Sequence, residues 1–141
     1  GPYDKFDLEN SHVFGATINK VLDKNASVIN MWGDGSEERD LLYISDLVDS
    51  IEKLIYLNDD ASLNIFNIGS GYAISVKKML EMIIDISGVK SKKINYDSSK
   101  PSVKTSISLN YSKARSILGW EPKISLEEGI KKTILWYKKI K

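Results

Sequence analysis

Two residues stand out as suited to chemistry by their type and position, the single histidine and one of only two arginines. His12 lies in the stretch ENSHVFG, where an imidazole that titrates near neutral pH could exchange protons with a substrate. The alternative is a polar residue that makes only local hydrogen bonds. Arg39 follows a glycine-rich turn and precedes an apolar run, so its guanidinium could grip a diphosphate with paired donors. The alternative there is an ion pair with Glu37, Glu38 or Asp40.

Three weaker features accompany them. Trp32 precedes the turn at 33–35 and could stack on a base or a sugar, or pack half-buried. Lys100, before Pro101, is a basic loop position for which a solvated side chain is the default. The segment NIGSG at 67–71 is similar to a phosphate loop. It lacks the third glycine, and the acid about 20 residues later, that a dinucleotide fingerprint needs, so it favours a plain strand-to-loop turn.

The composition is that of one globular domain. The chain has 141 residues, enough for a core, and it is 42% apolar and 28% charged. No apolar run approaches the roughly 18 residues of a membrane-spanning helix, and no signal peptide is visible. The absence of cysteine excludes disulfides and thiolate ligands, and a single histidine leaves only carboxylates for a metal. We therefore expect a cytoplasmic protein with no membrane partner and no metal site.

Charge is unevenly distributed along the chain. The net charge is +1, but acidic residues exceed basic ones over residues 1–60 and basic residues exceed acidic ones over 61–141. The basic part could attract an anionic ligand, or its lysines could be the solvated faces of helices. The small net charge and the scarcity of arginine argue against a nucleic-acid partner.

Apolar periodicity predicts helices that alternate with short strands, and hence an α/β fold. The first helix is expected after a cap at Asn10 or Ser11, and the second after a cap at Ser45 or Asp46. The second carries an apolar face between 47 and 55.

The later helices have clearer ends. The signals are Ser75 and Gly88 for the third helix, Gly119 after a short helix at 111–118, and a capping box of Ser125 with Glu128 for the last, which runs to 139.

Five strands are expected between these helices. They cover 27–32, 40–44, 63–68, 92–97 and 105–109. We assign residues 1–141 to a single domain, with no internal repeat or linker. The abrupt opening GPYDKFD, with no preceding strand, indicates a piece of a longer chain.

Taken together, these segments resemble the C-terminal part of extended short-chain dehydrogenase/reductases, the NAD(P)-dependent epimerase/dehydratase family that acts on nucleotide sugars. GPYDKFDLENSHV resembles the segment after the family's Asn-x-Tyr-Gly-Pro motif. WGDGSEERDLLYISDLVDSI and FNIGSG resemble two further family segments, and SKP with LGWEPKISLEEGIKKTILWY resembles its tail. NSHV, WG and SKP are most similar to the GDP-L-fucose synthase branch.

The resemblance assigns roles to residues at the first predicted helix. The histidine of NSHV is an acid/base next to a 4-keto group in that branch, which implies a catalytic role for His12. The basic residue eight positions later contacts the substrate, which implies Lys20, where the branch usually has arginine. Asn10 and Ser11 match positions that line the sugar and nicotinamide.

Three further substrate contacts follow from the same resemblance. The tryptophan before the glycine turn implies Trp32, and the arginine seven residues beyond it implies that Arg39 contacts the diphosphate. The lysine of SKP implies that Lys100 contacts the nucleotide. The implied ligand is therefore a nucleotide-diphosphate sugar.

The chain also departs from the branch. SKP is followed by SVKTSISLN, with Lys104 as the only basic residue and Asn110 where aspartate is usual, so a generic sugar-nucleotide epimerase or dehydratase is as plausible. The family's Gly-rich loop and Tyr-x-x-x-Lys pair do not occur here. The resemblance implies that NAD or NADP is bound mainly by an N-terminal half that this chain lacks, and that the isolated chain is inactive. Homodimers are common in the family, which leaves the oligomeric state of the parent open. The alternative is a non-catalytic binding or interaction domain of the same fold.

Overall fold

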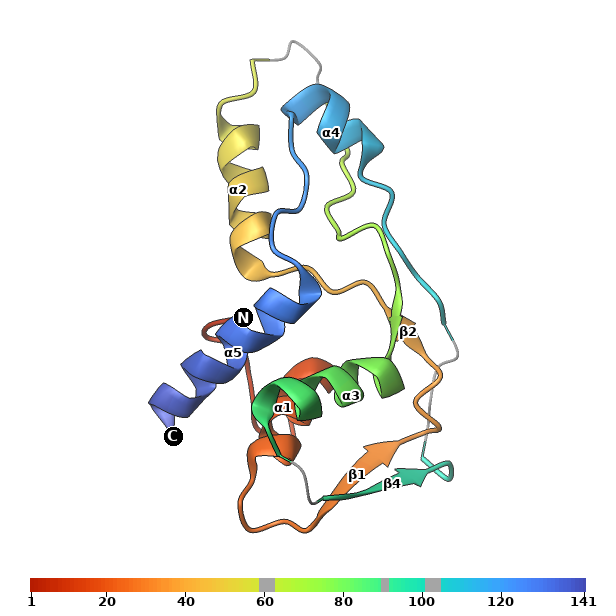
Figure 1. The fold of residues 1–141 in the computed structure, drawn as a ribbon. Coiled ribbons are helices and arrows are strands. Elements are labelled where there is room, and N and C mark those ends of the chain that lie inside the picture. Colours follow the sequence, from red (N-terminus) through yellow and green to blue (C-terminus); the bar gives the residue numbers. More distant parts are fainter. Residues whose placement is uncertain (59–62, 90–91, 101–104) are drawn as a thin grey trace.

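The computed structural model describes residues 1–58, 63–89, 92–100 and 105–141. Helices and short strands alternate along them (Figure 1), which confirms the α/β class. The elements are α1 (Val13–Leu22), β1 (Val28–Trp32), β2 (Glu38–Arg39), α2 (Ile44–Ile55), β3 (Ile74–Ser75), α3 (Val76–Ser87), β4 (Lys93–Asp97), α4 (Ser112–Leu118) and α5 (Leu126–Ile140).

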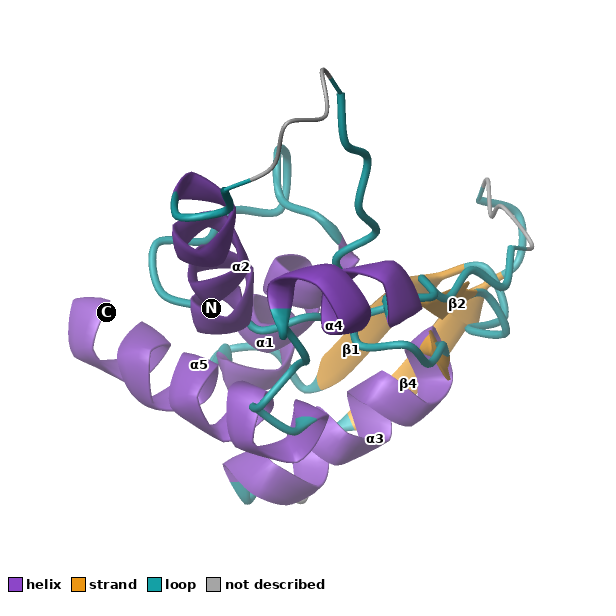
Figure 2. Ribbon diagram, turned by 90° about the horizontal axis from the view of Figure 1, so that it is seen from above, coloured by secondary structure: helices purple, strands orange, loops and turns teal. Residues whose placement is uncertain are grey.

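Two small sheets organise the strands. β1 and β4 pair in parallel, with Val28 opposite Lys93 and Trp32 opposite Asp97. β2 and β3 pair antiparallel, with Arg39 opposite Ile74. Figure 2 shows the strands grouped toward one end of the molecule, with α3 beside them. The strands predicted at 27–32 and 92–97 are therefore confirmed, within a residue at each end.

The other three predicted strands are wrong among the described residues. Residues 40–43 lie between β2 and α2, and Ile44 already belongs to the helix, because Leu41 and Leu42 pack into the two cores instead of a ladder. Residues 63–68 and 105–109 form no strand. One bond of a ladder does exist at the second segment, since the amide of Glu38 donates to the carbonyl of Thr105 at 2.8 Å.

Local capping signals place the later helices correctly. Ser75 Oγ accepts from the amide of Lys78 at 3.1 Å, and Gly88 ends α3 in the left-handed region with a φ of 75°. Ser125 Oγ accepts from the amide of Glu128 at 3.2 Å. The capping box is only half formed, because the Glu128 carboxylate pairs with Lys132 at 2.7 Å.

The predicted caps of the first two helices are wrong. His12 is the N-cap residue of α1, with no capping bond from its side chain, because Asn10 and Ser11 bond back to Asp7 instead. Tyr43 is the N-cap residue of α2, which begins before Ser45 and Asp46. The Asp46 side chain turns inward and bonds another segment.

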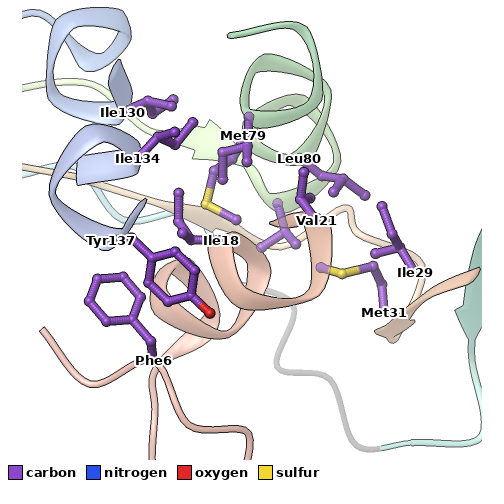
Figure 3. Packing of buried hydrophobic residues seen from close by; sticks show 12 residues of the cluster. Phe6, Ile18, Val21, Ile29, Met31, Met79, Leu80, Ile130, Ile134 and Tyr137 are labelled. Atoms are coloured by element: carbon purple, nitrogen blue, oxygen red, sulfur yellow. The ribbon is translucent and has the colours of Figure 1, made fainter. Parts of the chain in front are cut away.

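The main core lies where α1, α3 and α5 meet above β1 (Figure 3). Ile18 and Val21 of α1 pack with Met79 and Leu80 of α3, and Ile29 and Met31 come from the buried side of β1. Ile130, Ile134 and Tyr137 of α5 close it, and Phe6 lies against Tyr137, with ring centroids 4.8 Å apart. The apolar residues of α1 and α3 that recur at helical spacing are thus the ones that face this core.

A second, smaller cluster centres on Trp120, which is fully buried with Ala114 and Leu118. The indole Nε1 donates to the carbonyl of Asp46 at 2.9 Å. The Asp46 carboxylate accepts from the amides of Lys123 and Ile124 at 3.0 and 2.9 Å, so the start of α2 anchors the segment before α5. In the part of the chain that the structure describes, no helix is long and apolar enough to cross a bilayer.

Candidate functional site

Because β1 and β4 are parallel, their C-terminal ends lie side by side, and this brings two of the candidate residues together. Trp32 is the last residue of β1 and lies opposite Asp97, the last residue of β4. The carbonyl of Asp97 accepts from the amide of Gly33 at 2.9 Å and from the amide of Lys100 at 3.2 Å. Trp32 and Lys100 are therefore held at the same end of the two-stranded β1–β4 sheet, which we call the β1–β4 ribbon, although 68 positions separate them in sequence. Pro101 and Lys104 lie outside the described residues.

Trp32 is open to solvent, with 59% of its surface exposed. The half-buried alternative for this side chain is therefore wrong. It shares the exposed side of β1 with Asn30, whose Oδ1 accepts from Asn95 Nδ2 of β4 at 3.0 Å. The ribbon thus presents an aromatic ring next to two paired amides, a surface suited to stacking and hydrogen bonding with a flat polar ligand.

The carboxylate of Asp97, at this end of the ribbon, accepts hydrogen bonds from a residue close to it in sequence. Asp97 Oδ1 accepts from both the amide and the hydroxyl of Ser99, at 3.1 and 2.5 Å. These bonds, with the nearby charge of Lys100, hold the pKa of Asp97 below its usual range. The Lys100 side chain is exposed to solvent at this position.

Arg39 lies on β2, just beyond the turn that follows Trp32. Gly35 of this turn has a φ of 76°, and a Cβ there would lie 2.8 Å from Tyr96, so glycine is needed for both reasons. Arg39 Nη1 donates to the carbonyl of Glu38 at 2.8 Å and to Thr105 Oγ1 at 2.9 Å. Among the described residues no carboxylate pairs with Arg39, so the predicted alternative of a local ion pair is wrong.

The neighbouring Glu38 bonds elsewhere. The Glu38 carboxylate accepts from the hydroxyl of Ser106. The other arginine, Arg115, does pair with an acid, with its Nε 3.3 Å from Glu121 Oε2. Of the two guanidiniums, only that of Arg39 is half-buried, held by neutral oxygens and left with further N–H donors for an anion.

Asp40 is a structural residue that the sequence did not reveal as such. Its Oδ1 accepts from the amide and the hydroxyl of Ser70, at 2.7 and 2.6 Å. Its Oδ2 accepts from the amides of Leu109 and Gly71, at 2.9 and 3.2 Å. Burial would raise the pKa of Asp40, but these hydrogen bonds hold it below its usual range. No local pattern could have revealed this, because the partners are distant in sequence.

The Asp40 carboxylate also shows whether the segment NIGSG at 67–71 could bind a phosphate. The amides of Ser70 and Gly71, which a phosphate would need, already donate to Asp40. The segment is therefore a turn held by Asp40 that offers no phosphate cradle, as predicted, although the strand predicted to precede it does not form. Together, Asp40 and Arg39 hold the segment 105–109 along the end of β2.

The remaining candidates lie on α1. Asn10 and Ser11 form a tight turn with Asp7, whose carboxylate accepts from the amide of Asn10 at 2.6 Å. His12 follows on the surface at the start of α1, and its carbonyl accepts from the amide of Ala16 at 3.0 Å. Its ring makes no hydrogen bond among the described residues. It is thus accessible to a ligand from solvent.

Lys20 connects α1 to β1. Its Nζ donates to the carbonyl of Asn30 at 2.8 Å, and burial lowers the pKa of its ammonium group. Lys20 therefore lies beside β1, and Trp32 and Lys100 lie at the end of the β1–β4 sheet. The turn at 33–35 connects this end of β1 to Arg39 on β2. No hydrogen bond within the described ranges links Asn10, Ser11 or His12 to this group. Within the same ranges no cluster of three or more histidine or acidic side chains could hold a metal.

The family model of GDP-mannose 4,6 dehydratase matches residues 9–133 of the chain. The chain belongs to the NAD-dependent epimerase/dehydratase family. This confirms the resemblance to extended short-chain dehydrogenase/reductases.

Individual members agree with this assignment. The probable GDP-L-fucose synthase 1 of Oryza sativa subsp. japonica is 37% identical over 97% of this chain and 42% of its own length. UDP-glucose 4-epimerase from Thermotoga maritima, solved with UDP-glucose, matches 99% of this chain and 43% of its own at 32% identity, with a TM-score of 0.80. A mutant UDP-glucuronic acid 4-epimerase from Bacillus cereus, solved with NAD and a fluorinated UDP-sugar, matches 100% of this chain and 43% of its own at 26% identity, with a TM-score of 0.84.

The chain thus spans less than half the length of these family members. Its described elements correspond to one portion of the epimerase structures. Both solved family members carry a UDP-sugar, and one also carries NAD.

Proposed function

We propose that this chain is the nucleotide-sugar-binding part of an NAD(P)-dependent epimerase, dehydratase or reductase, possible types including a GDP-L-fucose synthase. The observation that carries the proposal is Arg39. Its guanidinium is fixed at the end of a strand by two neutral oxygens and is paired with no carboxylate among the described residues. A diphosphate is the ligand that such a planar, permanently charged fork fits best.

The other basic candidates complete the binding surface in this proposal. Lys100 and Trp32 share the end of the β1–β4 ribbon, where a cation can meet a phosphate and an indole can stack on a base or a sugar ring. Lys20 lies along β1, where burial has already removed part of the water around its ammonium group and lowers its pKa. Asn10 and Ser11 would line the sugar side.

The described residues offer no cradle of backbone amides for the diphosphate of NAD or NADP. The only segment similar to a phosphate loop has its amides occupied by Asp40. We expect the isolated chain to be inactive. In the longer family members the dinucleotide would be held by the portion outside the matched span.

His12 is the proposed acid/base. Its ring is exposed and makes no hydrogen bond within the described ranges, so it can take or give a proton at a carbon next to a 4-keto group. The alternative is that His12 is only structural. It is favoured by the matching family model, a 4,6-dehydratase, and by the two solved 4-epimerases. In such an enzyme His12 would serve only as the N-cap residue of α1.

Binding of GDP to the isolated chain tests the proposal, because ligand-observed NMR detects even millimolar affinity. We expect saturable binding that Arg39→Ala weakens by about tenfold or more, the effect of losing one bidentate charged contact. Arg115→Ala is the matched control, since that arginine is exposed and pairs with Glu121, and it should bind GDP as the unsubstituted chain does. A parallel titration with UDP shows whether the site prefers guanine or uracil as the nucleotide base.

Two results would contradict the proposal. One is the absence of GDP and UDP binding at millimolar concentration. The other is equal binding by the Arg39→Ala and Arg115→Ala variants, which would favour the non-catalytic scaffold. A heat-unfolding transition measured for each variant shows whether it is folded.

A further inference from the structure

The guanidinium of Arg39 is held through a single nitrogen. Nη1 carries two N–H groups and makes two hydrogen bonds, to the carbonyl of Glu38 at 2.8 Å and to Thr105 Oγ1 at 2.9 Å. Within the described ranges Nε and Nη2 make no hydrogen bond, so their N–H groups are available to a ligand. Nε–H and one N–H of Nη2 lie along the same edge of the guanidinium plane, and these two parallel donors fit two oxygens of one phosphate.

The two acceptors on Nη1 differ in origin. The carbonyl of Glu38 belongs to the residue before Arg39, so any residue at position 38 would supply it. The hydroxyl of Thr105 comes from a residue 66 positions away in the sequence. A single hydrogen bond leaves a planar group free to turn about that bond, whereas a second acceptor fixes the plane. The side chain of Thr105 therefore sets the orientation of the guanidinium.

Thr105 is itself fixed relative to β2. Its carbonyl accepts from the amide of Glu38 at 2.8 Å. Further along the same segment, the amide of Leu109 donates to Asp40 Oδ2 at 2.9 Å. These two bonds fall on the residues that flank Arg39 in sequence, so the hydroxyl of Thr105 is held in place before any ligand arrives.

The hydroxyl is also a neutral acceptor, which is important at a site for an anion. A carboxylate in its place would pair with the guanidinium and compete with a phosphate, whereas a hydroxyl holds the guanidinium without cancelling its charge. The carboxylate of Glu38, which could otherwise pair with Arg39, accepts from the hydroxyl of Ser106. The segment that contains Thr105 and Ser106 therefore orients Arg39 and leaves its positive charge available.

We propose that Thr105 is a positioning residue for nucleotide-sugar binding, whose hydroxyl orients the guanidinium of Arg39 so that its Nε–Nη2 edge meets the diphosphate. The inference rests on the proposed function, because it requires that Arg39 contacts a diphosphate. A guanidinium that is already oriented loses less conformational freedom when the ligand binds, and this raises the affinity.

Rotation of the guanidinium tests the orienting role without a ligand. The chain has two arginines, so NMR of a chain with isotope-labelled arginine gives two sets of guanidinium signals. Arg115 is the internal control, because its contact with Glu121 is made through Nε. We expect rotation about the Cζ–Nη1 bond to be at least about threefold slower in Arg39 than in Arg115. Thr105→Val should remove most of this difference, and Thr105→Ser, which keeps the hydroxyl, should preserve it.

GDP binding, followed by ligand-observed NMR, tests the consequence for the ligand. Thr105→Val has the same shape without the hydroxyl and should weaken GDP binding by about three- to tenfold, the effect of one hydrogen bond. Thr105→Ser should restore the affinity of the unsubstituted chain. Ser108→Ala removes an exposed hydroxyl from the same segment and is the matched control, which should bind GDP unchanged. In an Arg39→Ala background, Thr105→Val should have no further effect, because the hydroxyl would have no guanidinium to orient.

The outcomes separate this inference from the proposed function. If Arg39→Ala weakens GDP binding and a folded Thr105→Val variant does not, the proposed function stands and the positioning role is wrong. An equal loss from Thr105→Val with and without Arg39 would also overturn the positioning role, because the hydroxyl would then act through the fold in general. If the unsubstituted chain binds no GDP, or the Arg39→Ala variant binds it equally well, the proposed function fails and the role in diphosphate binding fails with it. Equal rotation rates in Arg39 and Arg115 would refute the orienting role alone. The heat-unfolding transition of each variant shows whether it is folded.

Discussion

The carboxylate of Asp40 accepts a 2.7 Å hydrogen bond from the backbone amide of Ser70, 30 residues further along the chain. The same carboxylate accepts from the amide of Leu109, 69 residues away, at 2.9 Å. One side chain thus ties the turn after 63–68 and the segment 105–109 to the end of β2. Because Arg39 immediately precedes Asp40, this tie also determines where the proposed diphosphate-binding arginine stands.

Asp40→Asn should destabilise the chain by about 1–3 kcal/mol at pH 7, because the charged acceptor is lost and one amide partner is left unsatisfied. Urea unfolding followed by circular dichroism measures this change. Asp85→Asn is the matched control, since Asp85 is an exposed residue of α3. A loss of stability as large in the control would show that Asp40 has no special role.

The stability of the unsubstituted chain should fall in acid partly through Asp40. Its pKa in the folded state is below its ordinary value, so the folded protein binds the proton less readily than the unfolded chain. The stabilisation is therefore present above the unfolded pKa of about 4 and is lost as the pH falls through the folded pKa. Urea midpoints between pH 6 and pH 3 should fall less steeply for Asp40→Asn than for the unsubstituted chain. Parallel slopes would contradict the assignment.

Asp46→Ala should cost about 1–3 kcal/mol, because the part-buried amides of Lys123 and Ile124 would lose their acceptor. Ser45→Ala should change the free energy of unfolding by less than about 0.5 kcal/mol, because Ser45 is exposed and does not cap α2. Chemical denaturation of the two variants compares neighbouring positions in one helix. A larger loss for Ser45→Ala would mean that the sequence-predicted cap operates after all.

Ile18→Ala should destabilise the isolated chain by about 2–5 kcal/mol, because Ile18 is fully buried between the helices of the main core. Ile51→Ala, on the exposed side of α2, should change stability by less than about 0.5 kcal/mol. Thermal and urea unfolding measure both. Comparable losses would show that α2 already packs its apolar side within this chain.

His12→Asn should abolish proton exchange at the carbons beside a 4-keto group in a full-length enzyme that carries this chain, while hydride transfer persists. Incorporation of solvent deuterium into a nucleotide 4-keto sugar, followed by NMR, is the measurement. Lys5→Asn, an exposed change near the same helix, is the control. Unchanged exchange in the His12 variant would favour a 4-epimerase or 4,6-dehydratase in which His12 is structural.

Much of the fold could be predicted because its signals are local. The Ser75 and Ser125 caps bond amides three residues away, and the glycines at 88 and 119 adopt the left-handed conformation within their own turns. The inner faces of α1 and α3 follow from helical periodicity. The family resemblance followed from the order of short motifs along the chain.

Partners distant in sequence decided the rest. Residues 40–44 have the composition of a strand, but the packing of Leu41 and Leu42 into two different cores prevents a ladder. The apolar stripe of α2 was visible in the sequence, but its exposure was not, because burial depends on what lies opposite. The partners of Arg39, and the carboxylate that accepts from the amides of Ser70 and Gly71, lie tens of residues away in sequence. Only the folded chain brings them together. The sequence by itself therefore determined the helices, the family and the residue types available for binding, and only the tertiary structure decided their partners, because hydrogen bonding and burial are properties of neighbours in space.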